Sequence, residues 1–444
     1  MSPNVRRDRK AFAELHPPLG DAEALVEAAR CLYCYDAPCT RACPTHIDIP
    51  RFIRQILHRD AIGAAKTILD ANIFGGSCAR VCPTQVLCEG ACVENTHLKS
   101  PVLIGRLQRH ACDAAQDESM RFYAAGPDTG KSVAVIGAGP AGLACAHELR
   151  KRGHRVTVFD ARNVAGGLNT LGIAAYKQDT AFALTEVERV KRIGVEIRLR
   201  QRTDAAKLRR LLAEYDAVFL AIGLGRTAPL SIPGENLKGV VESLELIART
   251  HTQPPGRCRV GRRVIVIGGG NTAMDAANAA VRLGAECVVV AYRRDREAMP
   301  AFAHEVELAA ASGVRFEWLA QPVRILGKSG RVRGVRFVRT RLSGKGRQAK
   351  LTPVRGSEFE LECDTVIKAL GQEPLRELLG GIDGITLTRE GRVQVDPATM
   401  ATGAPKLFAG GDCRAGAMEE VVSAVQDGKL AAAGIHARLC ALSA

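Results

Sequence analysis

Residues 131–160, "KSVAVIGAGPAGLACAHELRKRGHRVTVFD", contain an apolar run, a glycine-rich turn, an Ala/Leu-rich segment and a second apolar run. The order predicts strand, turn, helix and strand, which is the nucleotide-binding unit of a Rossmann fold. Gly137 makes the tight turn, Gly139 lets the backbone approach a pyrophosphate, and Gly142 allows the helix to pack on the strand. Asp160 ends the second strand, where a carboxylate accepts hydrogen bonds from a ribose diol.

A second unit of the same design occupies residues 262–292, "RRVIVIGGGNTAMDAANAAVRLGAECVVVAY". Gly268, Gly270 and Ala273 take the three glycine positions, with a small residue permitted in the third. Two dinucleotide sites in one chain imply hydride transfer between two cofactors, commonly a nicotinamide and a flavin.

The second unit ends in "AYRR" instead of an acid, so Arg293 and Arg294 stand where a ribose-binding carboxylate would be. Arginine at this place suits a 2′-phosphate and favours NADP over NAD. The alternative is that both are solvated charges beside Asp295 and Glu297.

Near the C-terminus, residues 407–435, "LFAGGDCRAGAMEEVVSAVQDGKLAAAGI", predict a strand, a glycine-rich turn and a long helix. Gly411 and Asp412 are candidates to hold the diphosphate and ribitol of a flavin. A helix beginning after Met418 would direct its positive dipole end toward the isoalloxazine. The alternative is a turn that only ends a strand.

Two dense cysteine runs precede the first Rossmann unit, "CLYCYDAPCTRACP" at residues 31–44 and "CARVCPTQVLCEGAC" at residues 78–92. The N-terminus has no apolar signal region and no long apolar run follows, so we expect a soluble cytoplasmic protein without a membrane partner. In a reducing cytosol such cysteines are more often metal ligands than disulfides. C-x2-C-x4-C-x3-C-P also differs from the paired C-x2-C of a zinc ribbon and is typical of iron-sulfur ligation.

Apolar periodicity predicts helices over residues 48–60 and 61–72, with Gly75 and Gly76 as a stop. The Gly/Pro/Ser/Asp stretch at 123–132 predicts a linker between domains. We therefore expect three regions: a helical cysteine domain at 1–125, a discontinuous flavin domain at 131–255 and 365–444, and a nicotinamide domain at 256–364.

The net charge of +15 raises the possibility of nucleic-acid binding. The basic residues are dispersed, however, and few aromatic residues accompany them. A basic surface that attracts anionic cofactors and an acidic partner is the preferred interpretation, without nucleic acid.

Taken together, the cysteine runs, "VIGAGPAG", "GGL" at 166–168, "GGGNTAMD", "AYRRDREAMPA", "DTVIKALGQEP" and "LFAGGDC" resemble the glutamate synthase small subunit and the N-terminal half of dihydropyrimidine dehydrogenase. The sequence resembles in particular the electron-entry subunit of the bacterial NAD-dependent dihydropyrimidine dehydrogenases. The resemblance covers nearly the whole chain. It implies an all-helical domain with two [4Fe-4S] clusters, followed by two Rossmann-type, glutathione reductase-like domains for FAD and NAD(P).

The resemblance also implies the cluster ligands. One cluster would take Cys31, Cys34, Cys39 and Cys92. The other would take Cys43, Cys82 and Cys88, with Gln108 as the unusual fourth ligand found in dihydropyrimidine dehydrogenases. Cys78 receives no role beyond a small buried side chain.

The expected cofactor contacts follow the family motifs. For FAD they are Gly137, Gly139, Pro140, Ala141, Gly142, Asp160, Gly167, Leu168, Gly411 and Asp412, and for the nicotinamide nucleotide Gly268, Gly270, Asn271, Thr272, Arg293 and Arg294. No side-chain catalytic residue is expected, because the cofactors carry the chemistry. NAD is implied by the resemblance, in tension with the two arginines.

The expected activity is oxidation of NAD(P)H through FAD, with electrons passed through the clusters to a partner that reversibly reduces uracil or thymine to 5,6-dihydropyrimidines. The chain has no room for the FMN-binding barrel that performs pyrimidine reduction. An FMN- and iron-sulfur-containing subunit would supply it, in a heterotetramer. The alternatives are a glutamate synthase small subunit or related NADPH-dependent donor, and a zinc-binding nucleic-acid adaptor.

Overall fold

The computed structural model describes residues 11–116, 120–344 and 346–441. The chain divides into two compact units. Of the described residues, the larger unit contains 15–116, 120–170, 177–224 and 374–441, and the smaller unit contains 225–344 and 346–373 with the short segments 11–14 and 171–176.

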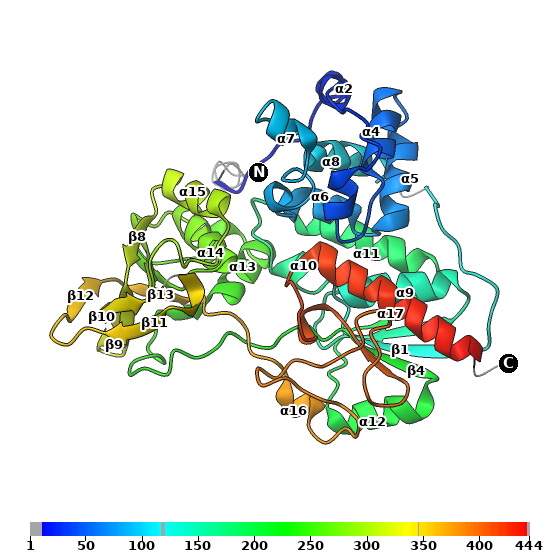
Figure 1. The fold of residues 1–444 in the computed structure, drawn as a ribbon. Coiled ribbons are helices and arrows are strands. Elements are labelled where there is room, and N and C mark those ends of the chain that lie inside the picture. Colours follow the sequence, from blue (N-terminus) through cyan, green and yellow to red (C-terminus); the bar gives the residue numbers. More distant parts are fainter. Residues whose placement is uncertain (1–10, 117–119, 345, 442–444) are drawn as a thin grey trace. The chain divides into compact units, whose positions relative to one another are not determined.

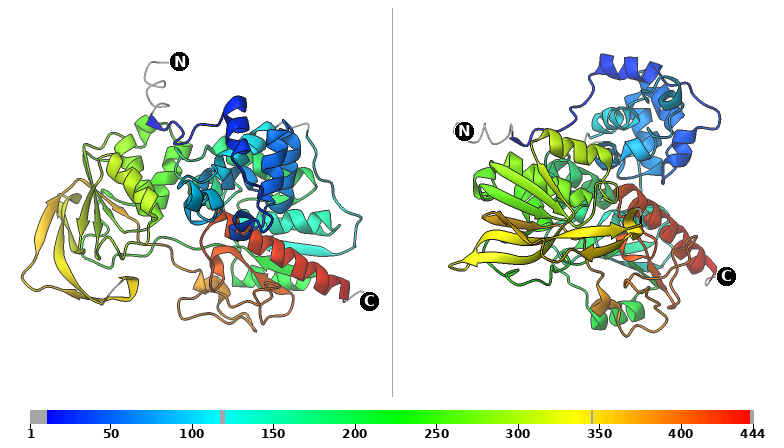
Figure 2. Two further views of the ribbon diagram at one scale, coloured as in Figure 1. Left: turned by 45° about the horizontal axis from the view of Figure 1, so that its top comes forward. Right: turned by 60° about the vertical axis from the view of Figure 1, so that its left-hand side comes forward.

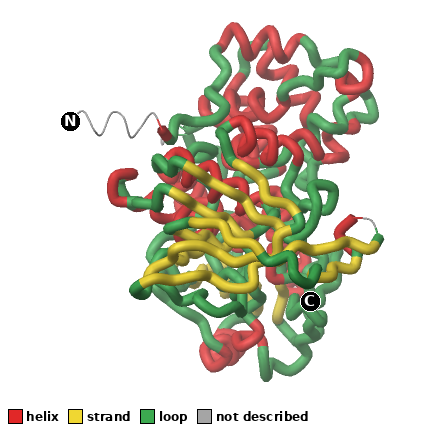
Figure 3. Tube along the Cα trace, turned by 90° about the vertical axis from the view of Figure 1, so that its left-hand side faces the viewer, coloured by secondary structure: helices red, strands yellow, loops and turns green. Residues whose placement is uncertain are grey.

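The N-terminal part of the larger unit is helical, and residues 11–116 contain no strand (Figure 3). Its α-helices are α2 (Asp21–Ala29), α3 (Pro38–Ala42), α4 (Ile49–Leu57), α5 (Ala61–Ala71), α6 (Gly75–Val81), α7 (Val93–His97) and α8 (Ile104–Ala114). The predicted helices at 48–60 and 61–72 are confirmed as α4 and α5. Asp48 and Asp60 cap them by accepting hydrogen bonds from the amides of Arg51 and Gly63.

The predicted helix stop at Gly75 and Gly76 is wrong, because these glycines begin α6. A Cβ on Gly76 would stand 2.4 Å from the ring of Phe182, and one on Gly75 would stand 2.4 Å from Ile68. The helix therefore needs glycine at its start for close packing, and a buried carboxylate supplies the missing cap, as described below.

A parallel five-stranded sheet follows, in the order β14-β4-β1-β2-β3 (Figure 1). Its strands are β1 (Ser132–Ile136), β2 (Arg155–Phe159), β3 (Glu196–Arg198), β4 (Ala217–Leu220) and β14 (Leu407–Ala409). The helices of this part are α9 (Pro140–Lys151), α10 (Leu168–Leu171), α11 (Thr180–Arg192), α12 (Ala205–Glu214), α16 (Arg376–Leu379) and α17 (Val421–Ala441). The expected order of strand, turn, helix and strand over 131–160 is confirmed as β1, α9 and β2.

Both faces of β1 are buried, as in other parallel sheets covered by helices. Val133 and Val135 belong to one core with residues of α9 and α17, and Ala134 and Ile136 belong to another with residues of α12. The helical cysteine part packs against the sheet part of the same unit. Phe74 belongs to the first of these cores, and Val422 of α17 belongs to the core of the helices that carry the cysteines.

The smaller unit has its own parallel sheet, in the order β5-β13-β6-β7-β8. The strands are β5 (Val240–Glu242), β6 (Arg263–Ile267), β7 (Cys287–Tyr292), β8 (Arg315–Trp318) and β13 (Thr365–Lys368), and the helices are α13 (Ser243–Thr252), α14 (Asn271–Arg282) and α15 (Ala303–Ala311). Between β8 and β13 lies an antiparallel sheet of β9 (Ala320–Lys328), β10 (Arg331–Ser343), β11 (Lys350–Pro353) and β12 (Phe359–Glu362), with β10 the long yellow strand of Figure 2.

The unit is wider than the expected span 256–364. Strand β13 lies between β6 and β5, and β5 pairs with β13 along its whole length. These hydrogen bonds draw residues before 256 and after 364 into the nicotinamide-type sheet, although the expected boundary had assigned them to the flavin domain.

Candidate functional site

Three glycine turns of the larger unit meet where β1 leads into α9. Gly137 has φ +107°, and a Cβ there would stand 2.2 Å from the carbonyl oxygen of Ala221. A Cβ on Gly167 would stand 2.9 Å from Cα of Gly139, and one on Gly411 would stand 3.0 Å from Cβ of Ala141. Segments far apart in sequence thus form one cradle of backbone.

Gly139 lies at the open side of this cradle. Its backbone is extended, and a Cβ there would have no protein atom within 4 Å. Gly142, in contrast, is packed so closely that a Cβ would stand 2.0 Å from the carbonyl oxygen of Gly137. Pro140 begins α9, and Leu168 begins α10 directly after Gly167. The arrangement fits a dinucleotide pyrophosphate at the N-terminus of α9.

The two acids of this site have different surroundings. Asp160 accepts hydrogen bonds from the amides of Ala138 and Arg162, both at 2.7 Å, so it also braces the glycine turn. Burial, with Glu419 nearby, raises the pKa of Asp412 to about 6. Asp412 follows Gly411, the third turn of the cradle.

An ion pair fixes the Gly411 turn. Asp427 of α17 accepts hydrogen bonds from the amide of Gly411 at 2.9 Å and from the guanidinium of Arg414 at 2.6 and 2.9 Å. The Asp427 side chain is 5% exposed. Sequence reasoning did not identify Asp427; the available signal was a single acid within the Ala/Val-rich helix.

The smaller unit repeats the glycine geometry. Gly268 has φ +149° and a Cβ there would stand 2.1 Å from the carbonyl oxygen of Ala369, whereas a Cβ on Gly270 would have no neighbour within 4 Å. Asn271 and Thr272 begin α14, and the Asn271 side chain accepts a hydrogen bond from the amide of Phe302. This turn also leaves space for a pyrophosphate.

The two arginines after β7 are not equivalent. Arg294 is half-buried and donates a hydrogen bond to the carbonyl oxygen of Ala349 at 2.7 Å. Arg293 is exposed, and its guanidinium forms no ion pair with the residues the structure describes. Asp295 accepts a hydrogen bond from the amide of Ala298. Of the pair, Arg293 is free to meet a phosphate.

Four cysteines from both runs line one cavity in the helical part. They are Cys31, Cys34, Cys39 and Cys92. The remaining wall is mainly apolar, with Ile49, Ile53 and Ile104 among its side chains. Burial raises the pKa of Cys39 to about 11, and the neighbouring thiols of Cys31 and Cys92 add to the rise. The four thiols that the resemblance assigned to one cluster thus surround a common space.

A second group of thiols lies around α6. A hydrogen bond to Cys78 and burial raise the pKa of Cys82, and the thiols of Cys88 and Cys43 act in the same direction. Cys78 also accepts a hydrogen bond from the side-chain amide of Asn72 at 3.2 Å. Cys78 lies in the last turn of α6 and Cys82 directly follows the helix, and their spacing of four residues could have revealed that they lie close together.

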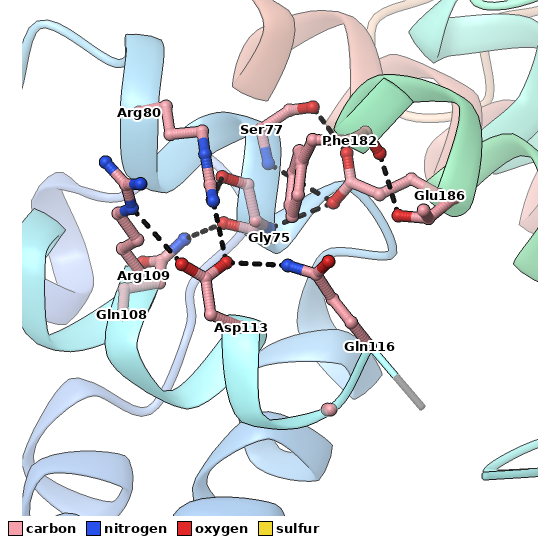
Figure 4. A network of polar contacts seen from close by, with 12 residues as sticks. Gly75, Ser77, Arg80, Gln108, Arg109, Asp113, Gln116, Phe182 and Glu186 are labelled. Atoms are coloured by element: carbon pink, nitrogen blue, oxygen red, sulfur yellow. Dashed lines mark hydrogen bonds and ion pairs between the residues drawn. The ribbon is translucent and has the colours of Figure 1, made fainter. Parts of the chain in front are cut away.

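Gln108 is buried on α8, and its side-chain amide donates a hydrogen bond to the carbonyl oxygen of Gly75 at 2.6 Å (Figure 4). Gly75 lies at the start of α6, the helix that carries Cys78 and ends directly before Cys82. A metal-ligand role for Gln108 stays a prediction. All fifteen cysteines are free thiols, and within the described ranges no three His, Cys, Asp or Glu side chains are arranged around a single metal ion.

None of the helices in the described part of the chain combines the length and apolar character needed to cross a membrane.

Two family matches together cover most of the chain. Residues 131–428 match the family "Pyridine nucleotide-disulphide oxidoreductase". Residues 8–120 match "Dihydroprymidine dehydrogenase domain II, 4Fe-4S cluster".

Individual relatives agree with these matches. The chain is 37% identical to the glutamate synthase [NADPH] small chain of Escherichia coli over 442 residues, covering 96% of this chain and 93% of that one. It is 34% identical to the E. coli NAD-dependent dihydropyrimidine dehydrogenase subunit PreT over 424 residues, covering 95% and 96%. Among solved structures, T. acidophilum thioredoxin reductase shares the fold, with a TM-score of 0.54, 23% identity and coverage of 70% of this chain and 99% of that one.

Proposed function

The chain belongs to the pyridine nucleotide-disulphide oxidoreductases and carries a 4Fe-4S domain of the dihydropyrimidine dehydrogenase type, and on this premise we propose that it is an electron-entry subunit. It is an oxidoreductase with FAD, NAD(P) and [4Fe-4S] cofactors. The 4Fe-4S match decides against the zinc-binding adaptor and against a disulfide framework.

We propose that the cradle of Gly139, Gly167 and Gly411 holds FAD, and that the turn at Gly270 holds the nicotinamide nucleotide. The two cysteine groups would each hold one cluster. When bound, a flavin accepts hydride as an electron pair and releases electrons singly. The protein's part is to bind and orient these groups, so no catalytic side chain is assigned.

The acceptor we propose is a partner subunit, containing FMN and iron-sulfur clusters, that reduces uracil or thymine to 5,6-dihydropyrimidines in a reversible reaction. Two copies of each chain would form a heterotetramer. The observation that carries the proposal is that the Gly139 cradle and both cysteine groups lie in one compact unit. The similarity to PreT over nearly the whole chain supports the choice of acceptor.

The proposal is tested by isolating the chain with its native partner and measuring NAD(P)H oxidation with uracil, thymine or no addition. Pyrimidine-dependent oxidation with matching formation of dihydropyrimidine is the expected result. A partner that forms glutamate instead would identify the second candidate, a glutamate synthase small subunit. The 37% identity to the E. coli glutamate synthase small chain is the observation that supports this second candidate.

A further inference from the structure

Helix α6, which carries Cys78 and ends directly before Cys82, begins against a carboxylate of α11 in the same unit. Glu186 of α11 accepts hydrogen bonds from the amides of Gly76 at 3.0 Å and Ser77 at 3.2 Å, and from the Ser77 hydroxyl (Figure 4). Glu186 is 1% exposed. Its two oxygens therefore satisfy the free amides at the start of α6.

Close packing around the contact between Glu186 and α6 restricts the movement of α6 relative to α11. Phe182, one turn before Glu186, fills the space that a side chain on Gly76 would need. The guanidinium of Arg80 lies 3.6 Å from the centre of the Phe182 ring and pairs with Asp113 of α8 at 2.7 Å. Figure 4 shows the three helices joined through these residues.

Ser77 also connects α6 to the cradle. Asn169 follows Leu168, and its side-chain amide donates to the Ser77 hydroxyl at 2.9 Å. Gln178 in turn donates to the carbonyl oxygen of Asn169 at 2.8 Å. A hydrogen bond thus joins Asn169, which directly follows the glycine turn at 166–168, to Ser77, the residue before Cys78.

A second charged residue, Lys429, binds the segment of the second cysteine group that contains Cys43. Lys429 of α17 donates to the carbonyl oxygens of Ala71 at 2.6 Å and Thr45 at 3.5 Å. The Thr45 hydroxyl lies 3.4 Å from the sulfur of Cys43. In contrast, the cavity of Cys31, Cys34, Cys39 and Cys92 is lined only by residues between 31 and 104.

Building on the proposed function, we propose that Glu186 and Lys429 are positioning residues for electron transfer out of the flavin site. Each anchors one segment of the second cysteine group to a helix that also builds the flavin-type fold. Reacting groups that are misplaced by about 1 Å can lose on the order of 100-fold in rate. The hydrogen bonds of Glu186 and Lys429 reach the cysteine group through Ser77, Thr45 and Ala71.

The test compares purified, cofactor-loaded Glu186→Gln and Lys429→Met with wild type, without a partner subunit. Glu188→Gln is the matched control, because Glu188 lies on the same helix and is exposed. Hydrogen exchange, iron and flavin content, and stopped-flow reduction by NAD(P)H are measured, the last at separate flavin and cluster wavelengths.

We expect full flavin and iron content and normal flavin reduction in both variants, with cluster reduction slowed about tenfold or more. Exchange should increase over residues 74–82 in Glu186→Gln and over 43–47 and 68–74 in Lys429→Met. Glu188→Gln should match wild type. Ser77→Ala, which removes only the hydroxyl, should slow cluster reduction less than Glu186→Gln.

Unchanged cluster reduction, or equal slowing of flavin and cluster reduction, would overturn the inference. Loss of both cofactors from Glu186→Gln and Ser77→Ala alike would also overturn it, because Glu186 would then stabilise the whole unit. Failure of NAD(P)H to reduce the wild-type flavin would instead contradict the proposed function.

Discussion

Asp427 and Arg414 form a partly buried ion pair whose carboxylate also accepts a hydrogen bond from the amide of Gly411, so Asp427 ties helix α17 to the turn between β14 and that helix. Replacing Asp427 with Asn would leave the Arg414 charge without its partner. Breaking a buried pair costs about 3–5 kcal/mol. We expect Asp427→Asn to lower the melting temperature and the bound FAD per chain, while Arg438→Gln, an exposed change on the same helix, should alter neither. Normal FAD content would show that the pair is not needed for the turn.

The two open glycine turns should be separable by mutation. Gly139 and Gly270 both have extended backbone and free space at Cβ, so valine fits the fold but occupies the space intended for a pyrophosphate. Gly139→Val should lose FAD and retain iron. Gly270→Val should retain FAD but not be bleached by NAD(P)H, although dithionite still reduces it. Absorbance spectra and iron analysis check both results, and an exchange of the two phenotypes would reverse the assignment.

Stability should depend on pH through Asp412. Because burial raises its folded pKa from 3.8 to about 6, its protonated form is favoured in the folded state. Protonated Asp412 contributes about 3 kcal/mol to the free energy of unfolding relative to high pH. This contribution is fully present below pH 4 and is lost as the pH rises through 6. Denaturant unfolding of wild type and Asp412→Asn between pH 4 and 8 measures this. The variant should gain relative to wild type as pH rises, and parallel curves would contradict the pKa shift.

Arg293 should distinguish the two nicotinamide nucleotides. If it meets a 2′-phosphate, removing its charge costs about 1.5–3 kcal/mol of binding, or roughly 10- to 100-fold in KM. Arg293→Gln should therefore raise the KM for NADPH and leave that for NADH nearly unchanged. The exposed Arg296→Gln is the control. Equal changes in the two KM values would indicate that Arg293 does not bind the 2′-phosphate and would favour NAD as the natural nucleotide.

The fourth ligand of the second cysteine group can be decided by iron analysis. Gln108 is the ligand implied by family resemblance, whereas Cys78 is the thiol that contributes most to raising the pKa of Cys82. If Gln108 is the ligand, Gln108→Ala should lose iron and change the cluster spectrum, and Cys78→Ala should not. The reverse pattern would make this an all-cysteine cluster. Losing one ligand of four leaves an open iron prone to loss.

The local pattern of the sequence was sufficient for much of the fold. Strand β1, helix α9 and strand β2 follow from hydrophobic periodicity and glycine spacing, which are properties of neighbouring residues. The boundary of the smaller unit was not accessible in this way. Strands β5 and β13 join its sheet through pairing between residues more than a hundred positions apart.

The same distinction applies to the site. Gly139 and Gly270 could be found from motifs, because their role depends on the adjacent turn. Glu186 and Lys429 lie on ordinary-looking helices, and what matters about them is a distant carbonyl or amide. Gly75 and Gly76 were misjudged for this reason, since the cap that starts their helix comes from Glu186.

The larger unit is interrupted in sequence by residues 225–373, and this determines the order in which the two units can fold during synthesis on the ribosome. The main segment of the smaller unit, residues 225–373, emerges as one piece and has its complete parallel sheet before residues 374–444 appear. The Gly411 turn, strand β14 and Lys429 all lie in that later segment. Because domains fold as units as the chain emerges, the nicotinamide-type domain should fold while translation is still under way. The Gly139 cradle and the support of the second cysteine group are completed only after the whole of residues 225–373 has emerged.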